Sequence, residues 1–401
     1  MLYSSQIKPA LRSSITFGIA VVALVSFGFN TPPVAGVAHF KTGKPTAKQI
    51  NLLVQQEMAE LHIPGMAVAV VRDGKLLYSG TFGMANLEWE QAVTKNTAFQ
   101  IASVTKLFTS TLVMKFIQDG KISLDDPVTN YLTDAPLSWK EVRVKHLLSH
   151  QSGIPWPASI GGFLGTRPST SDKPATKEQV YKDMTDSALV FKPGQKESYM
   201  NGDAFVLQMV LEKIAGKNIS EAFDEEVFSP LKMKNSGFDL ETRNFPAQVM
   251  KPVKNKSQIF TKGQSGPLVY KSFYNPTSYC SGGLYTSLDD VVKWAVALDK
   301  EEFLRHNIVE QLKTKMPLNS SFTALGWNRE MLNGHEAFGH SGGPGLGDIL
   351  RFPEQKLTII VFTNYADMYP YIAASIAKLY FPDISLPKAP KTLQRGFDKI
   401  M

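Results

Sequence analysis

The chain has 401 residues, of which 43% are hydrophobic and 20% charged, so it can bury a large core and form two or three domain-sized units. Its net charge of +7 is mild and dispersed, with no long basic run among aromatic residues, which argues against nucleic acid as a partner. The single cysteine, Cys280, excludes an internal disulfide.

The amino-terminal segment indicates an export signal. Lys8 and Arg12 precede an apolar stretch from Ile15 to Phe29, and small residues follow up to Ala38. A retained membrane anchor is the alternative, but the apolar stretch is shorter than the roughly 20 residues that a spanning helix needs. We expect cleavage after Ala38 and a periplasmic or secreted protein, with membrane contact only if the leader is retained.

Sheet-forming segments cluster at the two ends of the remaining chain. Residues 49–65 have helical spacing, and residues 66–83 follow as two strands joined by Asp73-Gly74, a strong hairpin signal. Near the other end, residues 346–352 and 357–364 are apolar runs around a Pro-Glu-Gln-Lys turn, and a helical pattern follows. Both ends therefore supply strands for an antiparallel sheet.

The chain between these ends is mainly helical. Capping boxes mark helix starts at Ser138 with Glu141, Thr176 with Gln179 and Ser287 with Asp290, and glycines mark helix ends at Gly120, Gly153 and Gly216. The pattern predicts an α+β fold: an antiparallel sheet from both termini, flanked by helices, with a mainly helical domain inserted and a cleft at the junction. The expected division is an export signal at 1–38, a linker at 39–47, a sheet domain at 48–102 and 280–385, a helical domain at 103–279 and a tail at 386–401.

Ser103 begins a long apolar helix that also carries Lys106. In the first turn of a helix, a hydroxyl lies near unpaired N–H groups and the positive end of the dipole, which favours a developing anion. Lys106, three residues later, lies on the same face. If the helix is buried, desolvation favours the neutral amine, which can take the serine proton. A helix N-cap with a solvated lysine is the alternative for this spacing taken alone.

A second candidate pair precedes another strong helix. Tyr199 and Asn201 are two residues apart in an extended segment, so both can face one cleft while Met200 faces inward. A phenol beside a lysine loses its proton more easily, which makes Tyr199 a second candidate base, and the Asn201 amide can bind an acyl amide or the lysine. A helix-entry loop with a packed tyrosine is the alternative.

Residues 339–343, GHSGG, fit the Gly-x-Ser-x-Gly pattern of hydrolases with an elbow serine. Ser341 as a nucleophile of that kind needs a later histidine, but His340 is the last one, and a hairpin rather than a helix is predicted to follow. Another role fits better, because glycines permit close backbone approach beside a ligand. The Gly343 N–H can then join that of Ser103 as an oxyanion hole.

These three elements, in this order, resemble the serine β-lactamase and penicillin-binding-protein superfamily, most closely its class C, DD-peptidase and esterase branch. Ser103-Val104-Thr105-Lys106 matches the first family motif, Tyr199-Met200-Asn201 the second and His340-Ser341-Gly342 the third. Segments such as KISLDDPVTNYL, VKHLLSHQSGIP and SGGLYTSLDDVVKWAVAL are also similar to family segments, and the resemblance extends over residues 48–380.

The resemblance implies acyl transfer through a covalent ester on Ser103, with acid and base work shared by Lys106 and Tyr199. The implied substrate-binding residues are Asn201, His340, Ser341, Gly342 and Gly343. We expect neither a metal nor a cofactor. β-Lactamases of this branch usually carry a lysine at the position of His340, where its charge helps to hold a substrate carboxylate. Histidine is mostly neutral at neutral pH, which weakens the case for efficient β-lactam hydrolysis and widens the substrates to peptides and esters.

The leading hypothesis is an exported serine hydrolase that acts on a small amide or ester: a β-lactam, a D-amino-acid peptide of cell-wall type or a carboxylic ester. The resemblance fits DD-peptidase, D-aminopeptidase and esterase activities. The alternative is a poorly hydrolytic penicillin-binding or cell-wall sensor module that stays acylated. Residues 161–190 are expected near the cleft, with no role assigned.

Other features favour structural roles. His146 and His150 have the helical spacing of a zinc pair but lack the glutamate of the helical zinc-protease motif and an evident third ligand, so packing is favoured. Turn and core roles are favoured for Asp125-Asp126 and Cys280. Three aromatic residues are candidates for either cleft or core: Trp156, Tyr274 and Trp327.

Overall fold

The computed structural model describes residues 44–155, 176–244, 247–270, 274, 276–317, 320–343, 346–368, 370–386 and 392. They all belong to one unit, Phe40–Met401. The expected export signal, Trp156 and the first half of the stretch 161–190 lie outside the described residues.

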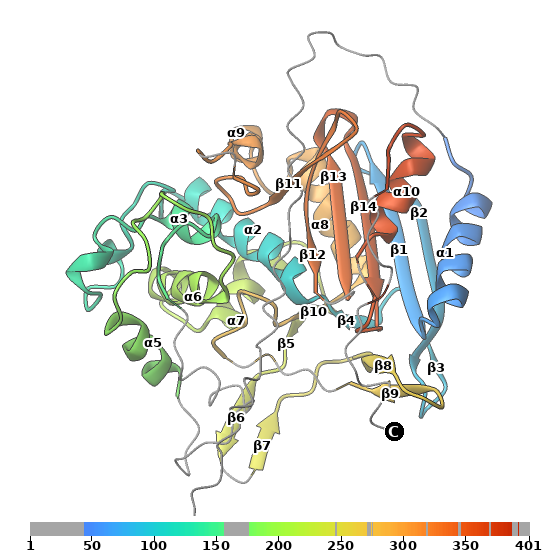
Figure 1. Ribbon diagram of the computed structural model, residues 1–401, viewed down its shortest axis with the longest axis horizontal. Coiled ribbons are helices and arrows are strands. Elements are labelled where there is room, and N and C mark those ends of the chain that lie inside the picture. Colours follow the sequence, from blue (N-terminus) through green and yellow to red (C-terminus); the bar gives the residue numbers. More distant parts are fainter. Residues whose placement is uncertain are drawn as a thin grey trace, which may run out of the picture. The chain divides into compact units, whose positions relative to one another are not determined.

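One antiparallel sheet is built from both ends of the described chain, with the strand order β11-β12-β13-β14-β1-β2-β3 (Figure 1). Its strands span Gly65–Arg72 (β1), Lys75–Asn86 (β2), Gln91–Ala92 (β3), Asn328–Leu332 (β11), His335–Gly342 (β12), Gly347–Phe352 (β13) and Leu357–Thr363 (β14). Early β1 pairs with late β14, in a register from Met66↔Thr363 to Arg72↔Leu357. The predicted α+β fold, with a sheet from both termini and flanking helices, is confirmed.

The β1–β2 hairpin turns at Asp73 and Gly74, which have positive φ values of 49° and 65°. A turn of this kind matches the right-handed twist of the paired strands. Successive residues of β1 point to opposite faces of the sheet and so enter two separate cores. Met66, Val68 and Val70 enter one core, and Ala67, Ala69 and Val71 enter the other.

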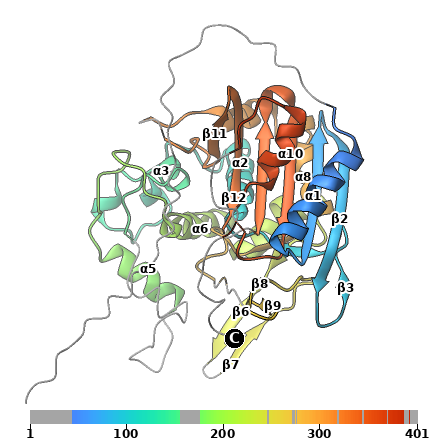
Figure 2. The ribbon, with the colours of Figure 1, turned by 45° about the vertical axis from the view of Figure 1, so that its right-hand side comes forward.

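Helices cover both faces of this sheet (Figure 2). α1 (Ala47–Leu61) and α10 (Ile372–Tyr380) pack in the core of Val68, whereas α2 (Thr105–Gln118) and α8 (Leu288–Lys300) pack in the larger core of Ala69. The larger core continues into α6 (Asn201–Ala215). One face of β1 therefore looks toward α2 and the other toward α10.

The middle of the chain contains short helices and additional strands. The other α-helices are α3 (Val144–Leu148), α5 (Lys177–Thr185), α7 (Ile219–Phe223) and α9 (His306–Val309), and Asp224–Phe228 forms a π-helical turn. The 3-10 helices are η1 (Ala102–Val104), η2 (Val128–Asn130), η3 (Leu137–Trp139), η5 (Glu310–Lys313) and η6 (Pro353–Gln355). The shorter strands are β4 (Ala98–Gln100), β5 (Gly237–Phe238), β6 (Glu241–Asn244), β7 (Ala247–Met250), β8 (Phe260–Lys262), β9 (Pro267–Val269) and β10 (Leu284–Ser287). Part of the expected helical domain is thus extended, and the domain boundaries stay a prediction.

Two of the three predicted helix caps are confirmed. The Thr176 side chain accepts the Gln179 N–H at the start of α5, and the Ser287 side chain accepts the Asp290 N–H at the start of α8. The cap at Ser138 is wrong, because this segment forms only the single 3-10 turn η3 with no side-chain cap.

Two of the three predicted helix ends are close to the observed ones. α2 ends at Gln118, two residues before Gly120, and Gly216 caps α6 in the left-handed conformation. The end at Gly153 is wrong, since α3 already stops at Leu148.

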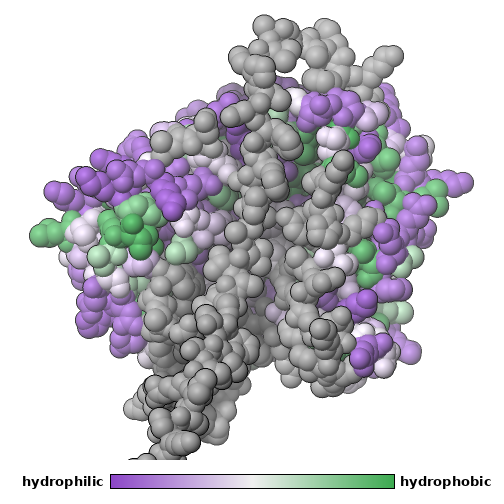
Figure 3. Space-filling model, viewed as in Figure 1, coloured by the Kyte–Doolittle hydropathy of each residue, from purple (hydrophilic) through white to green (hydrophobic). Residues whose placement is uncertain are grey.

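Hydrophobic side chains reach the surface in separate small patches on the face shown in Figure 3. Among the described residues, Leu137 and Trp89 are the most exposed large hydrophobic residues, at 88% and 80%. Within the described ranges, no helix is long and apolar enough to cross a membrane.

Candidate active site

Ser103 lies in the 3-10 turn η1, directly before α2. The preceding residue, Ala102, has a φ of 46°, in the left-handed region that costs a non-glycine residue on the order of 1 kcal/mol or more. Ile101 and Ala102 have no exposed surface, so the surrounding core holds this strained turn in place. Ser103 itself is partly exposed, which leaves it at the surface of the site.

Lys106 lies one helical turn after Ser103 and is only 7% exposed. Its Nζ donates to the Ser281 carbonyl oxygen at 2.7 Å and to Asn201 Oδ1 at 3.1 Å, and it lies 3.4 Å from Ser103 Oγ. The same nitrogen is 4.9 Å from the centre of the Tyr199 ring. The amine is thus held by two oxygen acceptors and directed at the serine hydroxyl.

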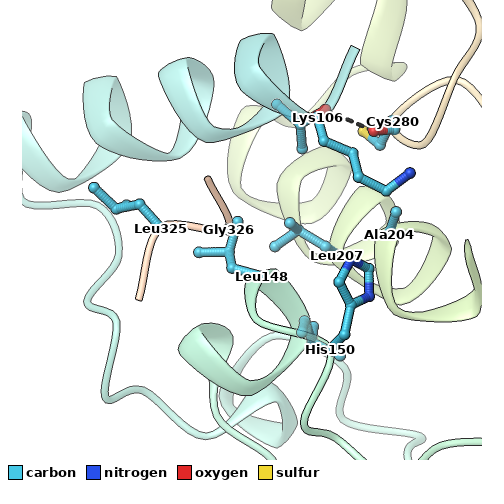
Figure 4. Close-up of a pocket in the computed structure, with 10 residues that line it drawn as sticks. Lys106, Leu148, His150, Ala204, Leu207, Cys280, Leu325 and Gly326 are labelled. Carbon is cyan, nitrogen blue, oxygen red and sulfur yellow. Dashed lines mark hydrogen bonds between the residues drawn. The ribbon is translucent and has the colours of Figure 1, made fainter. Parts of the chain in front are cut away.

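A small cavity lies beside the aliphatic stem of Lys106 (Figure 4). Its lining includes Leu148, His150, Ala204 and Leu207. The space open to the centre of a water molecule is about 10 Å³, close to the minimum that one ordered water needs. This cavity is therefore too small for an acyl substrate, and it does not mark the substrate cleft.

Tyr199 and Asn201 both reach the first motif from the segment that enters α6. The Tyr199 hydroxyl donates to Ser103 Oγ at 3.0 Å. Asn201, the first residue of α6, presents its Oδ1 to Lys106. The Tyr199 ring stacks on Phe322 with the ring centres 6.0 Å apart. The side chains at 199 and 201 therefore meet at one place, as the extended spacing predicts.

His340 lies on the face of β12 that looks toward Tyr199, with their ring centres 6.0 Å apart. Its Nδ1 lies 2.7 Å from the Ser341 carbonyl oxygen, so Nδ1 carries the hydrogen and Nε2 is an acceptor. Burial lowers the pKa of His340 to about 3. This histidine is therefore neutral and supplies no fixed positive charge.

Ser341 points to the other side of β12, because adjacent side chains of a strand alternate. Its hydroxyl donates to Asp348 Oδ1 at 3.0 Å, directly across the β12–β13 pair. Burial, together with the nearby Glu330, raises the pKa of Asp348 to about 7. The structure does not place the Ser341 hydroxyl in contact with Ser103, so a substrate-binding role for Ser341 stays a prediction.

Gly342 brings the end of β12 against the turn that carries Ser103. A Cβ at this position would lie 2.1 Å from the Ile101 carbonyl oxygen and 3.3 Å from the Ala102 Cβ, so only glycine fits without displacement. Gly343 is exposed, and a Cβ there would meet open space. An oxyanion hole formed by the Gly343 and Ser103 N–H groups stays a prediction.

Comparison with known proteins identifies the family of this chain. The family model described as Beta-lactamase matches residues 50–377. The chain belongs to the beta-lactamase family. It is 26% identical to the octameric penicillin-binding protein homologue from Pyrococcus abyssi, whose structure matches with a TM-score of 0.70 over 86% of this chain and 80% of that one.

Two curated relatives match over a similar stretch. Protein flp of Staphylococcus aureus (strain MW2) is 22% identical, and the Unguisins hydrolase ungD' of Aspergillus campestris (strain IBT 28561) is 25% identical, each over 80% of this chain. The chain spans less than two thirds of these relatives, 64% of the first and 62% of the second. The likeness therefore concerns the shared family domain.

Three residues of this beta-lactamase family site were missed by sequence reasoning. Ser281 contributes its backbone carbonyl, which residue identity does not signal, and Phe322 stacks on Tyr199 from a distant loop. His150 was expected to pack at a helix end, but it contacts the Tyr199 ring with the centres 4.4 Å apart. The signal that could have found His150 is its position in the segment VKHLLSHQSGIP, which is similar to a family segment.

The residues expected to be structural have identifiable contacts. His146 Nδ1 accepts the Arg143 N–H at 3.2 Å, and Asp126 accepts from the Ser123 N–H at 2.6 Å. Cys280 is fully buried, and burial raises the pKa of its thiol. In the described part of the chain, no group of three or more His, Cys, Asp or Glu residues is arranged to hold a metal ion.

The two described aromatic candidates differ in position. Trp327 has no exposed surface, and its Nε1 donates to Ser110 Oγ at 3.0 Å, which places it in the core. The Tyr274 ring lies against Gly282, where a Cβ would be 2.3 Å from it. Because Gly282 follows Ser281, Tyr274 lies next to the active site.

Proposed function

We propose that this protein is an exported serine hydrolase that forms a covalent acyl-enzyme on Ser103 and acts on a small amide or ester. The observation that carries the proposal is the environment of one oxygen atom. Ser103 Oγ lies 3.0 Å from the Tyr199 hydroxyl and 3.4 Å from Lys106 Nζ. A hydroxyl between two groups that can exchange protons is the arrangement of an activated nucleophile.

The contacts of Lys106 support a role as the base that takes the serine proton. A neutral amine has two N–H groups and one lone pair, and the two acceptors at Ser281 and Asn201 engage both N–H groups. The lone pair then points to the remaining neighbour, Ser103 Oγ. In the proposed step the amine takes the Ser103 proton while Oγ forms a bond to the substrate carbonyl carbon.

Tyr199 is placed to complete the proton transfer. It donates to the same oxygen that attacks, and it can next give its proton to the leaving amine or alcohol and regain one through Lys106. The oxyanion donors in this proposal are the N–H groups of Ser103 and Gly343, as the family resemblance implies. Attack of water on the ester then frees Ser103 and returns a proton to the site.

The neutral His340 supports peptide and ester substrates over β-lactams. A substrate carboxylate gains little from an uncharged imidazole, whereas the lysine common in β-lactamases would attract it. The relative named Unguisins hydrolase supports hydrolysis in general. A D-amino-acid peptide of the cell wall and a carboxylic ester remain the proposed substrate classes, and the export signal predicted from the sequence favours a periplasmic or secreted location.

A second candidate is a penicillin-binding or cell-wall sensor module that stays acylated, favoured by the 26% identity to a penicillin-binding protein homologue. Incubation with a fluorescent penicillin and a chromogenic short-chain ester separates the two. Ester turnover that is lost in Ser103→Ala supports the hydrolase, and a stable fluorescent label without turnover supports the sensor. Loss of activity in Ser341→Ala with activity retained in Ser103→Ala would refute both.

A further inference from the structure

His150 forms hydrogen bonds on both sides of Tyr199. Its carbonyl oxygen accepts the Ser198 N–H at 2.8 Å, and its side-chain Nδ1 accepts the Met200 N–H at 3.3 Å. One residue from the chain after α3 thus fixes the peptide units before and after Tyr199. The backbone of the segment that carries the phenol is therefore tied to His150 rather than free to shift.

The conformation of His150 is what allows both contacts. Its φ is 57°, in the left-handed region that is uncommon for residues other than glycine. This turn lets the carbonyl and the ring engage the same neighbouring segment. A strained residue that is held by its surroundings is more often found where function needs fixed geometry.

The imidazole also packs against the phenol that it positions. The ring centres of His150 and Tyr199 are 4.4 Å apart, and those of His150 and Phe322 are 5.0 Å apart. The rings of His150, Tyr199 and Phe322 therefore form one cluster, and the Tyr199 hydroxyl is directed at Ser103. Small displacements of the Tyr199 ring would change the 3.0 Å distance between its hydroxyl and Ser103 Oγ.

The ring of His150 is neutral. It is 2% exposed, and burial lowers its pKa to about 3. Nδ1 accepts a hydrogen bond and so carries no hydrogen, which assigns the hydrogen to Nε2. Asp203 lies 3.4 Å from Nδ1, but burial raises the pKa of this carboxyl. Because the imidazole is neutral, the Met200 bond does not depend on an ion pair with Asp203.

We propose that His150 is a positioning residue for acyl transfer: it holds the backbone around Tyr199 so that the phenol stays on Ser103 Oγ. This inference rests on the proposed function, because it assumes that Tyr199 acts on Ser103 during acylation. His150 lies outside the three motifs and is thus an additional functional residue of the site. His150 acts only through Tyr199 and needs no contact with the substrate.

The test is the second-order rate of Ser103 labelling by a fluorescent fluorophosphonate, which replaces fluoride with the serine oxygen. His150→Gln moves the acceptor away from Met200, whereas His150→Asn keeps an acceptor near the position of Nδ1 and tolerates the left-handed conformation. His146→Gln is the matched control, since His146 is also largely buried and accepts a backbone N–H through Nδ1. His150→Phe repeats the loss of the acceptor if His150→Gln does not fold.

We expect His150→Gln to slow labelling by about ten- to a hundredfold, the scale on which misplacement of a reacting group acts. His150→Asn and His146→Gln should stay within about threefold of the natural protein. In a Tyr199→Phe background, His150→Gln should have little further effect, because the two residues act through one contact.

Two results would overturn the positioning role, and a third would overturn the proposed function. Equal labelling of His150→Gln and the natural protein, or an equal loss with and without Tyr199, overturns the positioning role. Undiminished labelling of Ser103→Ala instead overturns the proposed function itself, whatever the His150 variants do.

Discussion

The Tyr199 phenol donates a hydrogen bond to the Ser103 hydroxyl over 3.0 Å. The two residues come from different parts of the fold, one from the turn before α2 and the other from the segment before α6. The Nζ of Lys106, in α2, also lies 3.4 Å from this serine oxygen. The site therefore depends on how the turn before α2 and the segment before α6 are held together, as well as on any single motif.

Tyr199→Phe should slow ester hydrolysis by about 10²- to 10⁴-fold, the usual contribution of a positioned acid or base. The fold should be kept, because the ring still packs against His150 and Phe322. Initial rates with a chromogenic ester and a thermal melt measure the two effects. A rate within about threefold of the natural protein would show that the phenol takes no part in proton transfer.

His340→Lys should shift selectivity toward substrates with a carboxylate. Its charge would stand where the natural side chain is neutral, as the lowered pKa of His340 indicates. We expect the rate of labelling by a fluorescent penicillin, divided by the rate for a neutral ester, to rise about fivefold or more. His340→Met has similar length without charge and is the control. An unchanged ratio, or an equal rise in His340→Met, argues that charge at this position does not select substrates.

Gly342→Ala should destabilise the protein. The new methyl group would lie 2.1 Å from the Ile101 carbonyl oxygen, so β12 or the Ser103 turn must move. Overpacking of this kind costs about 1–3 kcal/mol in the free energy of unfolding. Gly343→Ala is the matched control for stability, because the space around Gly343 is open. Urea unfolding of both variants gives the comparison, and equal stability of the two contradicts the close approach.

Asp348→Asn should change how stability depends on pH. The folded pKa of Asp348 is raised to about 7 from the ordinary 3.8, so the folded state holds a proton that the unfolded state releases. The free energy of unfolding therefore falls as the pH rises from the ordinary pKa of 3.8 through the folded pKa of about 7. Asparagine has no such proton and can still accept from Ser341.

Unfolding of both forms at about pH 5 and about pH 8 tests this sign. Asp348→Asn should gain stability relative to the natural protein at the higher pH. A stability difference that is the same at both pH values would show that Asp348 does not titrate in this range.

The first two motifs were predictable from the sequence because they use local geometry. Helical spacing places Lys106 one turn from Ser103, and extended spacing places Tyr199 and Asn201 on one side of their segment. The sheet was predictable from the hairpin signals at both chain ends. The family resemblance then indicated that these separate segments meet.

Other parts of the site could not be read from the sequence. Ser281 acts through a backbone carbonyl and Phe322 through a long-range stacking contact, and neither leaves a local pattern. The sequence also did not show which residues of β12 face the site. His340 faces Tyr199, whereas the Ser341 side chain faces the other way and contacts Asp348 across the strand pair. That distinction depends on which core each face of the sheet enters.

Mapping the acyl adduct by mass spectrometry tests the central claim most directly. The protein is quenched during turnover of a chromogenic ester or after incubation with a penicillin, digested and sequenced by fragmentation. We predict a mass increase equal to the acyl group on the peptide that contains Ser103, and none in Ser103→Ala. An adduct on the peptide that contains Ser341, or sustained Ser103-independent turnover, would contradict the account.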